Sequence, residues 1–173
     1  LFGARQTGKA TLVNRLDRET SGLVVTAKNP GAARACRAQF ADRRVTKRYL
    51  ALVEGAFPDT LDARGAMRDD PGGPVRKRRL FVAGMTPMES AGEWASTGFR
   101  RLAAAGGISL VEAEPSTGRL HQIRATLLAV GFPLVGDKLY GTDPERFLRF
   151  CKGALTEADR AALRMDRQAL HAA

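Results

Sequence analysis

The fold is constrained most strongly by two strand-like stretches, in which successive side chains point to alternate faces, and by the pair of glycines that joins them. Residues 94–102 alternate between two faces, which is typical of a half-exposed strand. Gly106-Gly107 favours a tight turn, and residues 108–114 predict the returning strand of a β-hairpin. Residues 47–54 predict a further strand with alternating faces. Antiparallel pairing is therefore expected to organise much of the fold.

Helical and strand patterns follow one another along the chain without a strict β-α-β order. Apolar residues recur at helical spacing over residues 120–128, and residues 32–40 predict an alanine-rich helix. Thr156 and Asp159 resemble a capping pair before a last helix, and residues 23–27 form a β-branched run typical of a strand. The fold class expected from this arrangement is α+β with an antiparallel or mixed sheet.

Length and turn residues predict how this fold is divided. The chain has 173 residues, of which 44% are hydrophobic, so residues 1–173 are expected to form a single domain with its own core. Residues 65–74 contain too many turn-forming residues for a regular element, and we expect a loop there.

The charge of the chain indicates an acidic partner. Lys and Arg number 28 against 18 Asp and Glu, which gives a formal net charge of +10. Arg greatly outnumbers Lys, which favours bidentate phosphate contacts and stacking on bases. Nucleic acid is the commonest large acidic partner, although a merely soluble basic protein explains the charge equally well.

Several classes of protein do not fit the sequence. No apolar run is long enough for a membrane-spanning helix, and no apolar core of a signal peptide follows the first residues. Cys36 and Cys151 stand far apart, and His121 and His171 are the two histidines, so no recognised zinc spacing exists. We therefore expect a cytoplasmic protein that uses no metal and does not bind a membrane.

The segment from Gly3 to Lys9 has the spacing of a phosphate-binding loop. The next residue is Ala10, where coordination of Mg²⁺ requires Ser or Thr, and too few residues precede the segment to form a strand. A nucleotide-dependent enzyme is therefore a remote hypothesis.

A carboxylate between two arginines is the first candidate for chemistry. Asp17 lies between Arg15 and Arg18, and two nearby cations hold a carboxylate in its ionised form. An ionised carboxylate serves as nucleophile, as base or as anchor for a substrate hydroxyl. The alternative is a loop aspartate that pairs with an arginine or caps a turn, and in isolation this alternative is favoured.

The segment 118–124 is the second candidate. A turn that leads into a helix directs backbone N–H groups and basic side chains at one point, which suits an anion. Helical spacing places Gln122 and Arg124 away from the apolar face. An ordinary helix start with solvated arginines, and a hydrogen-bonded structural histidine at His121, are the alternatives.

A tyrosine next to basic residues is the third candidate. Tyr49 follows Lys47 and Arg48 on a predicted strand, where a tyrosine most often packs in the core. In this basic setting the ring is also suited to stack on a nucleobase.

Taken together, these segments resemble the RluA-type family of RNA pseudouridine synthases. The family's His-Arg-Leu-Asp-Arg-x-Thr-Ser-Gly block is matched by residues 15–22, and its Lys-x-Tyr-x-Ala-x-Val-x-Gly block by residues 47–55. Its last two blocks are matched by residues 117–124 and 131–141, so the resemblance covers about residues 15–140 in the family's order. It implies a mixed, largely antiparallel central sheet flanked by helices, with a catalytic cleft.

The resemblance also implies an activity and its residues. RNA pseudouridine synthases isomerise uridine to pseudouridine in rRNA or tRNA without cofactor or metal. Asp17 is expected to be the catalytic aspartate, Tyr49 to pack against the base and help late proton removal, and Arg119 to pair with Asp17. The expected RNA-binding residues are Arg15, Arg18, Thr20, Lys47, His121, Gln122 and Arg124.

The chain departs from the family pattern at three places. Asn14 stands where the family has histidine, no upstream Lys-Pro strand precedes residue 15, and the chain stops at residues 170–173, where the family continues into a last strand. We therefore expect a domain shortened at both ends, without a separate RNA-binding domain, and take it to be a monomer. The alternative function is an inactive RNA-binding or RNA-folding remnant of the same fold.

Overall fold

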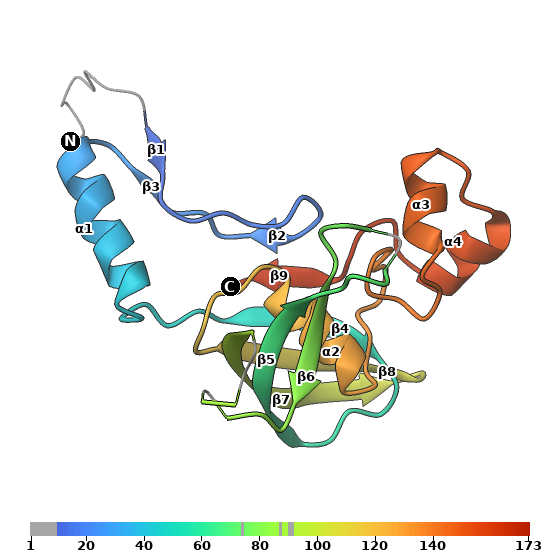
Figure 1. Ribbon diagram of the computed structural model, residues 1–173. Helices are drawn as coiled ribbons and strands as arrows, with labels where there is room; N and C mark the ends of the chain where they lie inside the picture. Colours follow the sequence, from blue (N-terminus) through green and yellow to red (C-terminus); the bar gives the residue numbers. More distant parts are fainter. Residues whose placement is uncertain (1–9, 74, 87, 90–91) are drawn as a thin grey trace.

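A computed structural model describes residues 10–73, 75–86, 88–89 and 92–173 (Figure 1). The centre of the molecule is a seven-stranded sheet with the order β2-β9-β4-β8-β7-β5-β6. Its strands are β2 (Ser21–Gly22), β4 (Tyr49–Glu54), β5 (Thr60–Asp69), β6 (Arg79–Ala83), β7 (Glu93–Ala105), β8 (Ile108–Pro115) and β9 (Leu170–Ala172). Strands β2 and β9 pair in parallel, and the other neighbouring pairs are antiparallel. The α+β class and the mixed, largely antiparallel sheet are confirmed.

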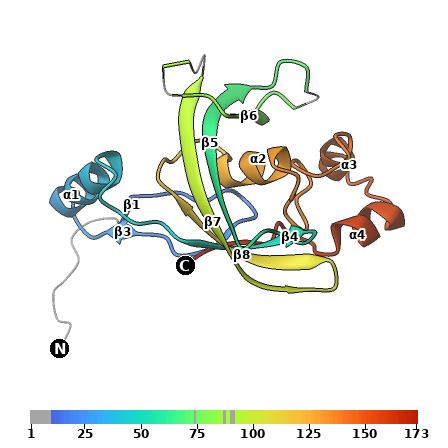
Figure 2. The same ribbon diagram turned by 90° about the horizontal axis from the view of Figure 1, so that it is seen from below.

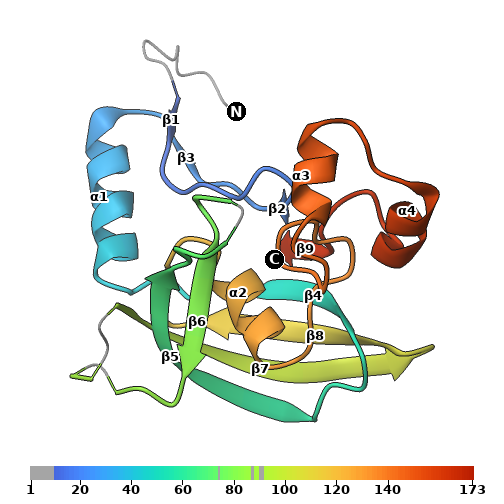
Figure 3. The same ribbon diagram turned by 45° about the vertical axis from the view of Figure 1, so that its right-hand side comes forward.

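Helices flank this sheet at both ends and on one face (Figures 2 and 3). At one end, α1 (Pro30–Ala41) packs with a two-stranded ribbon of β1 (Thr11–Leu12) and β3 (Thr26–Ala27). At the other end lie α3 (Arg146–Cys151) and α4 (Glu157–Leu163). Helix α2 (Gln122–Ala129) packs against the sheet, with contacts to β6 and β8.

The predicted hairpin and helix caps form for the expected reasons. Strands β7 and β8 are joined by Gly106 and Gly107, which have φ values of 58° and 75°, the left-handed conformation that a two-residue hairpin turn requires. Thr156 and Asp159 form a reciprocal capping box at the start of α4. The alternating residues of β7 and β8 supply core side chains such as Phe99.

Three expectations about secondary structure are wrong. Residues 65–69 belong to β5, because pairing with β6 and β7 on both sides outweighs their weak strand propensity. Residues 23–25 are exposed and lie between two short strands instead of forming one. Residues 170–172, where we expected no strand, form β9 between β2 and β4. The phosphate-loop-like residues 3–9 lie outside the described residues.

Pairing of β2 with β9 depends on the absence of a side chain at Gly22. Its φ is +114°, and a Cβ at this position would lie 2.1 Å from the backbone oxygen of Ala172. We expect Gly22→Ala to lower the free energy of unfolding, measured by urea denaturation, by about 3 kcal/mol. Gly84→Ala is the matched control, because Gly84 has a φ of +80° with nothing within 4 Å of the added Cβ. The control should cost only about 1 kcal/mol, and equal losses would contradict the account.

Candidate active site

The order of the strands brings three distant segments of the chain together. Strand β9 lies between β2, which follows Asp17, and β4, which begins at Tyr49. Tyr49 pairs with Ala172 of β9 on one side and with Ala113 of β8 on the other. The segment that follows β8 therefore emerges next to Tyr49, and it carries Arg119.

A cleft of about 680 Å³ opens where these segments meet. Asp17, Tyr49 and Arg119 all line this cleft, as the resemblance implied. It is also lined by all the expected RNA-binding residues except Arg18, namely Arg15, Thr20, Lys47, His121, Gln122 and Arg124. Arg18 is exposed on the turn beside the cleft.

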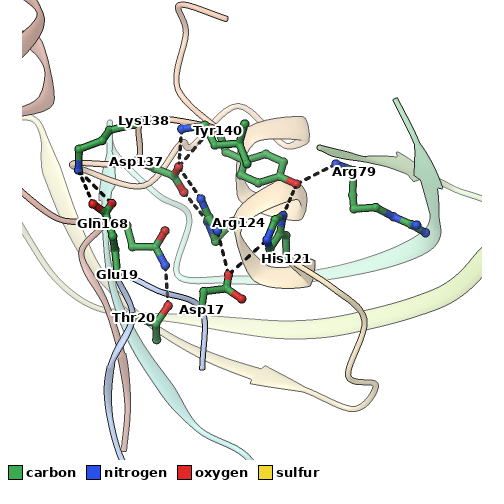
Figure 4. A network of polar contacts seen from close by, with 11 residues as sticks. Asp17, Glu19, Thr20, Arg79, His121, Arg124, Asp137, Lys138, Tyr140 and Gln168 are labelled. Carbon is green, nitrogen blue, oxygen red and sulfur yellow. Dashed lines mark hydrogen bonds and ion pairs between the residues drawn. The ribbon is translucent and has the colours of Figure 1, made fainter. Parts of the chain in front are cut away.

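Asp17 begins a tight turn and lines the cleft, and its two carboxylate oxygens differ in their contacts. The N–H of Thr20 donates to the backbone carbonyl of Asp17 at 3.0 Å, which closes the turn. The Oδ2 atom accepts a hydrogen bond from Nη1 of Arg124 at 2.9 Å and lies 4.0 Å from Nε2 of His121 (Figure 4). Within the described part of the chain, Oδ1 has no hydrogen-bond partner, and 26% of the side chain is exposed. One oxygen is thus oriented by a cation while the other remains available.

Arg124 is held by a second carboxylate that is fully buried. Its Nε and Nη2 donate to the two oxygens of Asp137 at 2.7 and 2.9 Å. The backbone N–H groups of Leu139 and Tyr140 also donate to Asp137, each at 2.9 Å. Burial opposes both charges, but the hydrogen bonds between the two side chains raise the pKa of Arg124 and lower the pKa of Asp137. Arg124 is therefore a fixed cation at neutral pH.

The expected pair between Arg119 and Asp17 is not what the structure shows. Among the described residues, the guanidinium of Arg119 contacts the carbonyl of Trp94 at 3.0 Å and Glu93 at 3.2 Å. Arg124 occupies the position on Asp17 instead, because the first turn of α2 directs its side chain into the interior. The interpretation of Arg124 as lying away from the buried face is therefore wrong.

Gln122 is buried, and its side-chain amide has no hydrogen-bonding position left for RNA. Its Oε1 accepts from the Thr117 hydroxyl at 2.8 Å and from the Arg119 N–H at 3.0 Å. Its Nε2 donates to Ser96 at 3.1 Å and to Thr97 at 2.9 Å. All four hydrogen-bonding positions of this amide are used within the chain. Gln122 thus fixes the segment that carries Arg119 to β7, which corrects its expected role.

His121 is oriented by a phenol that the sequence analysis did not select. The Tyr140 hydroxyl lies 2.9 Å from Nδ1 of His121 and accepts the N–H of Arg79 at 2.8 Å. The Asp17 carboxylate, 4.0 Å from Nε2, can only accept a hydrogen bond, whereas the phenol can donate as well as accept. We therefore expect the Tyr140 hydroxyl to donate to Nδ1 and the imidazole proton to be on Nε2. Burial raises the pKa of Tyr140 to about 12, so the phenol keeps this hydrogen. Burial, followed by the charge of Arg124, lowers the pKa of His121.

Two further contacts hold the turn that carries Asp17. Lys138 Nζ donates to both oxygens of Glu19 at 2.9 Å. The Gln168 amide donates to the hydroxyl of Thr20 at 2.5 Å. Thr20 is therefore engaged by the protein, and the turn is tied to two separate segments beyond residue 135.

The remaining cleft residues differ in whether their side chains are bonded within the protein or exposed to a ligand. Lys47 donates to the carbonyl of Thr117 at 2.7 Å, and burial, together with the charge of Arg43, lowers its pKa. Burial, together with the nearby Asp17, raises the pKa of Tyr49, so the phenol is neutral at physiological pH. Arg15 is exposed at the cleft.

Three of the residues missed by the sequence analysis, Asp137, Lys138 and Tyr140, lie close together in residues 136–141. The sequence analysis matched residues 131–141 to a block of the family but assigned these three residues no role. In the structure they hold Arg124, Glu19 and His121, respectively. Charged residues between the apolar Leu134-Val135 and Leu139 were the available signal, since a charge among core residues requires a partner. The partner's identity was not readable from that pattern.

The fold is that of RNA pseudouridylate synthase domains. The solved structure of human RNA pseudouridylate synthase domain containing 1 superposes with a TM-score of 0.72 at 28% identity, covering 95% of this chain and 62% of that one. Residues 4–129 match the family model described as RNA pseudouridylate synthase. The chain belongs to this family, and the resemblance to its RluA-type members is confirmed.

Curated relatives agree with this assignment. An uncharacterized RNA pseudouridine synthase of Chloroflexus aurantiacus is 39% identical over 162 residues, which are 94% of this chain and 43% of that protein. Ribosomal large subunit pseudouridine synthase D of Zymomonas mobilis is 32% identical over 175 residues, 100% of this chain and 50% of that protein. The mitochondrial tRNA pseudouridine(32) synthase of Saccharomyces cerevisiae is 35% identical over 153 residues, 88% and 32% of the two chains. The chain spans at most half the length of these three relatives.

Two kinds of structural feature are absent from the described residues. None of the helices there is long and apolar enough to cross a membrane. No group of three or more His, Cys, Asp or Glu side chains in the same residues is placed to hold a metal ion.

The protonation state and tautomer of His121 can be measured directly, because the chain has two histidines and their NMR signals are easily assigned. Nitrogen NMR at neutral pH should show the proton on Nε2 and a titration midpoint below the ordinary pKa of 6.5. Because the folded state binds this proton less readily than the unfolded chain, His121 should lower stability as the pH falls below 6.5.

Tyr140→Phe is the variant that tests the origin of this state. It removes the hydroxyl and keeps the ring over which Arg124 stacks at 4.9 Å, so the nitrogen shifts of His121 should change. The shifts of His171, assigned with His171→Asn, serve as the internal control. A midpoint at or above 6.5, or unchanged His121 shifts in the variant, would contradict the assignment.

Proposed function

We propose that this chain isomerises uridine to pseudouridine within RNA, with Asp17 as the nucleophile. The observation that carries the proposal is the unequal use of the two oxygens of the cleft-lining Asp17: Arg124 binds Oδ2, whereas Oδ1 has no hydrogen-bond partner among the described residues. An ionised, oriented carboxylate with one open oxygen is what attack on a nucleoside requires. Family membership supplies the reaction class.

The reaction rearranges one nucleoside without oxidation or reduction. Oδ1 of Asp17 attacks the target nucleoside, the bond between ribose C1′ and uracil N1 breaks, and the uracil turns while still in the cleft. Its C5 then bonds to C1′, the carboxylate leaves, C5 loses its proton and N1 gains one. Retaining the detached base next to the sugar converts a bimolecular step into an intramolecular one. A base in a helical stack reaches this cleft only when it is flipped out.

In this proposal Tyr49 contacts the uracil base, and Arg119 supports the flipped-out nucleotide. The raised pKa of Tyr49 makes it a neutral phenol that packs against uracil and passes the C5 proton to the released Asp17 carboxylate. Arg119, with 31% of its side chain exposed, supports the extruded nucleotide from the cleft side. Arg124 acts through Asp17 as a positioning residue.

The proposed substrate is rRNA or tRNA, because relatives that act on each of these RNAs match this chain to similar extents. Arg15 and Lys47 line the cleft, and Arg18 is exposed beside it, so these cations are placed to bind the RNA backbone. A cytoplasmic location fits such substrates. The net charge of +10 leads us to expect binding that weakens steeply with salt.

Asp17→Asn tests the nucleophile while keeping the shape of the side chain. We expect it to abolish pseudouridine formation in unmodified rRNA and tRNA transcripts and to leave RNA affinity within about twofold, since the amide cannot attack C1′. Asp62→Asn, an exposed aspartate on β5, is the matched control and should retain wild-type turnover. The readout is mapping of pseudouridine in the transcripts.

The other outcomes of this assay identify the alternatives. Equal modification by wild type and Asp17→Asn would remove Asp17 from the mechanism. Binding by both without modification by either would favour the inactive RNA-binding remnant. Modification that requires ATP would support the phosphate-loop hypothesis.

Tyr49→Phe separates packing from proton transfer. The ring that packs against the base remains, so RNA affinity should be unchanged, whereas turnover at saturating RNA should fall by about tenfold or more because the hydroxyl relay is lost. Unchanged turnover would reduce Tyr49 to a packing residue.

A further inference from the structure

A second hollow lies beside the cleft, between α3, α4 and the segment that leads to β9. We call it the α4 hollow; its volume is about 620 Å³. Four of its lining residues are cationic, Lys138, Arg160, Arg164 and Arg167, and one, Asp166, is acidic. Asp17 and Thr20 line the cleft, whereas Glu19 of the same turn contacts Lys138 of the α4 hollow. The turn that carries Asp17 therefore lies between the two, and Figure 4 shows Glu19 directed to Lys138 and away from His121.

The α4 hollow holds positive charge that the protein does not neutralise. Lys138 is paired with Glu19, and Arg164 lies 3.6 Å from Glu54. Arg160 and Arg167 are exposed, and neither has a carboxylate within ion-pair distance anywhere in the described part of the chain. Two guanidinium groups at one hollow are thus free to bind an external anion.

The framework of the hollow is fixed before any ligand binds. Asp159 of α4 accepts hydrogen bonds from Arg149 at 2.8 Å and Arg146 at 3.3 Å, both on α3. On the other side, the N–H of Ala169 donates to the carbonyl of Val135 at 2.8 Å. Because these walls are already ordered, binding there requires no rearrangement of the backbone.

The unpaired guanidinium groups of this hollow favour the phosphate backbone of a nucleic acid over a protein partner. Guanidinium groups form planar, two-pronged contacts that match phosphate oxygens. The volume lies within the range of sites that hold a group of nucleotide size. A continuous RNA strand that places one nucleotide at Asp17 also carries phosphates on both sides of that nucleotide. We propose that the α4 hollow binds the backbone of the substrate RNA outside the cleft, with Arg160 and Arg167 as the phosphate-binding residues.

This inference rests on the proposed function for the identity of the RNA, but it is tested by binding and not by turnover. The probes are an unmodified tRNA transcript and an unmodified fragment of large-subunit rRNA. Dissociation constants are measured between about 50 and about 200 mM salt for the wild type and for Arg160→Gln/Arg167→Gln. Both side chains lack ion-pair partners within the described residues, so the free energy of unfolding should be unchanged.

We expect the double variant to weaken binding by about tenfold and to reduce the slope of log K against log salt by about 1 to 2, because two phosphate contacts are lost. Turnover at saturating RNA should stay at the wild-type level. The matched control is Lys28→Gln/Arg34→Gln, which removes two exposed charges at the α1 end, where a change below about twofold is expected.

Equal losses in the two double variants would overturn the inference, because the effect would then follow net charge alone. Wild-type affinity and slope in Arg160→Gln/Arg167→Gln would overturn it as well, and so would a wild-type protein that binds neither RNA. A specific loss of affinity in a protein that forms no pseudouridine would support the α4 hollow and reject only the proposed catalytic function.

Discussion

The guanidinium of Arg124, shared between two carboxylates, is the interaction on which the site depends. Two of its nitrogens bind the buried Asp137, and the third binds Asp17 at the cleft. A buried ion pair adds little stability by itself, because desolvation offsets the attraction. Removing one member is different, since it leaves an uncompensated buried charge at a cost of about 3–5 kcal/mol. The role of the Arg124–Asp137 pair is therefore to fix the position of Arg124, which in turn orients the Asp17 carboxylate and leaves one of its oxygens free.

A single short loop supplies three anchors of the turn that carries Asp17 and of its surroundings. Asp137 holds Arg124, Lys138 holds Glu19, and Tyr140 holds His121 (Figure 4). The loop reaches this position because Gly136 has a φ of +76° and lies so close to residue 167 that a Cβ would come within 2.1 Å of its backbone oxygen. The same packing joins the loop to the segment that borders the α4 hollow, so cleft and hollow share one support.

The sequence predicted correctly those features of the fold that depend on a few neighbouring residues. The double-glycine hairpin and the capping box form as expected, since turn and cap chemistry act over a few residues. The convergence of Asp17, Tyr49 and Arg119 was expected from the resemblance alone. The partner of Asp17 was not predictable, because two arginines in one motif are equivalent in sequence, and only the orientation of α2 chooses between them. The strand at residues 65–69 was missed because its stability comes from pairing on both sides.

The most direct test of this account is the single-turnover rate of Arg124→Lys on an unmodified RNA transcript. Lysine keeps the positive charge but cannot bind two carboxylates in the forked geometry of a guanidinium. The account predicts a folded protein with wild-type RNA affinity and a rate of pseudouridine formation lowered by about a hundredfold or more. A wild-type rate in the folded variant would show that charge alone is enough, and it would contradict the claim that a shared guanidinium orients the nucleophile.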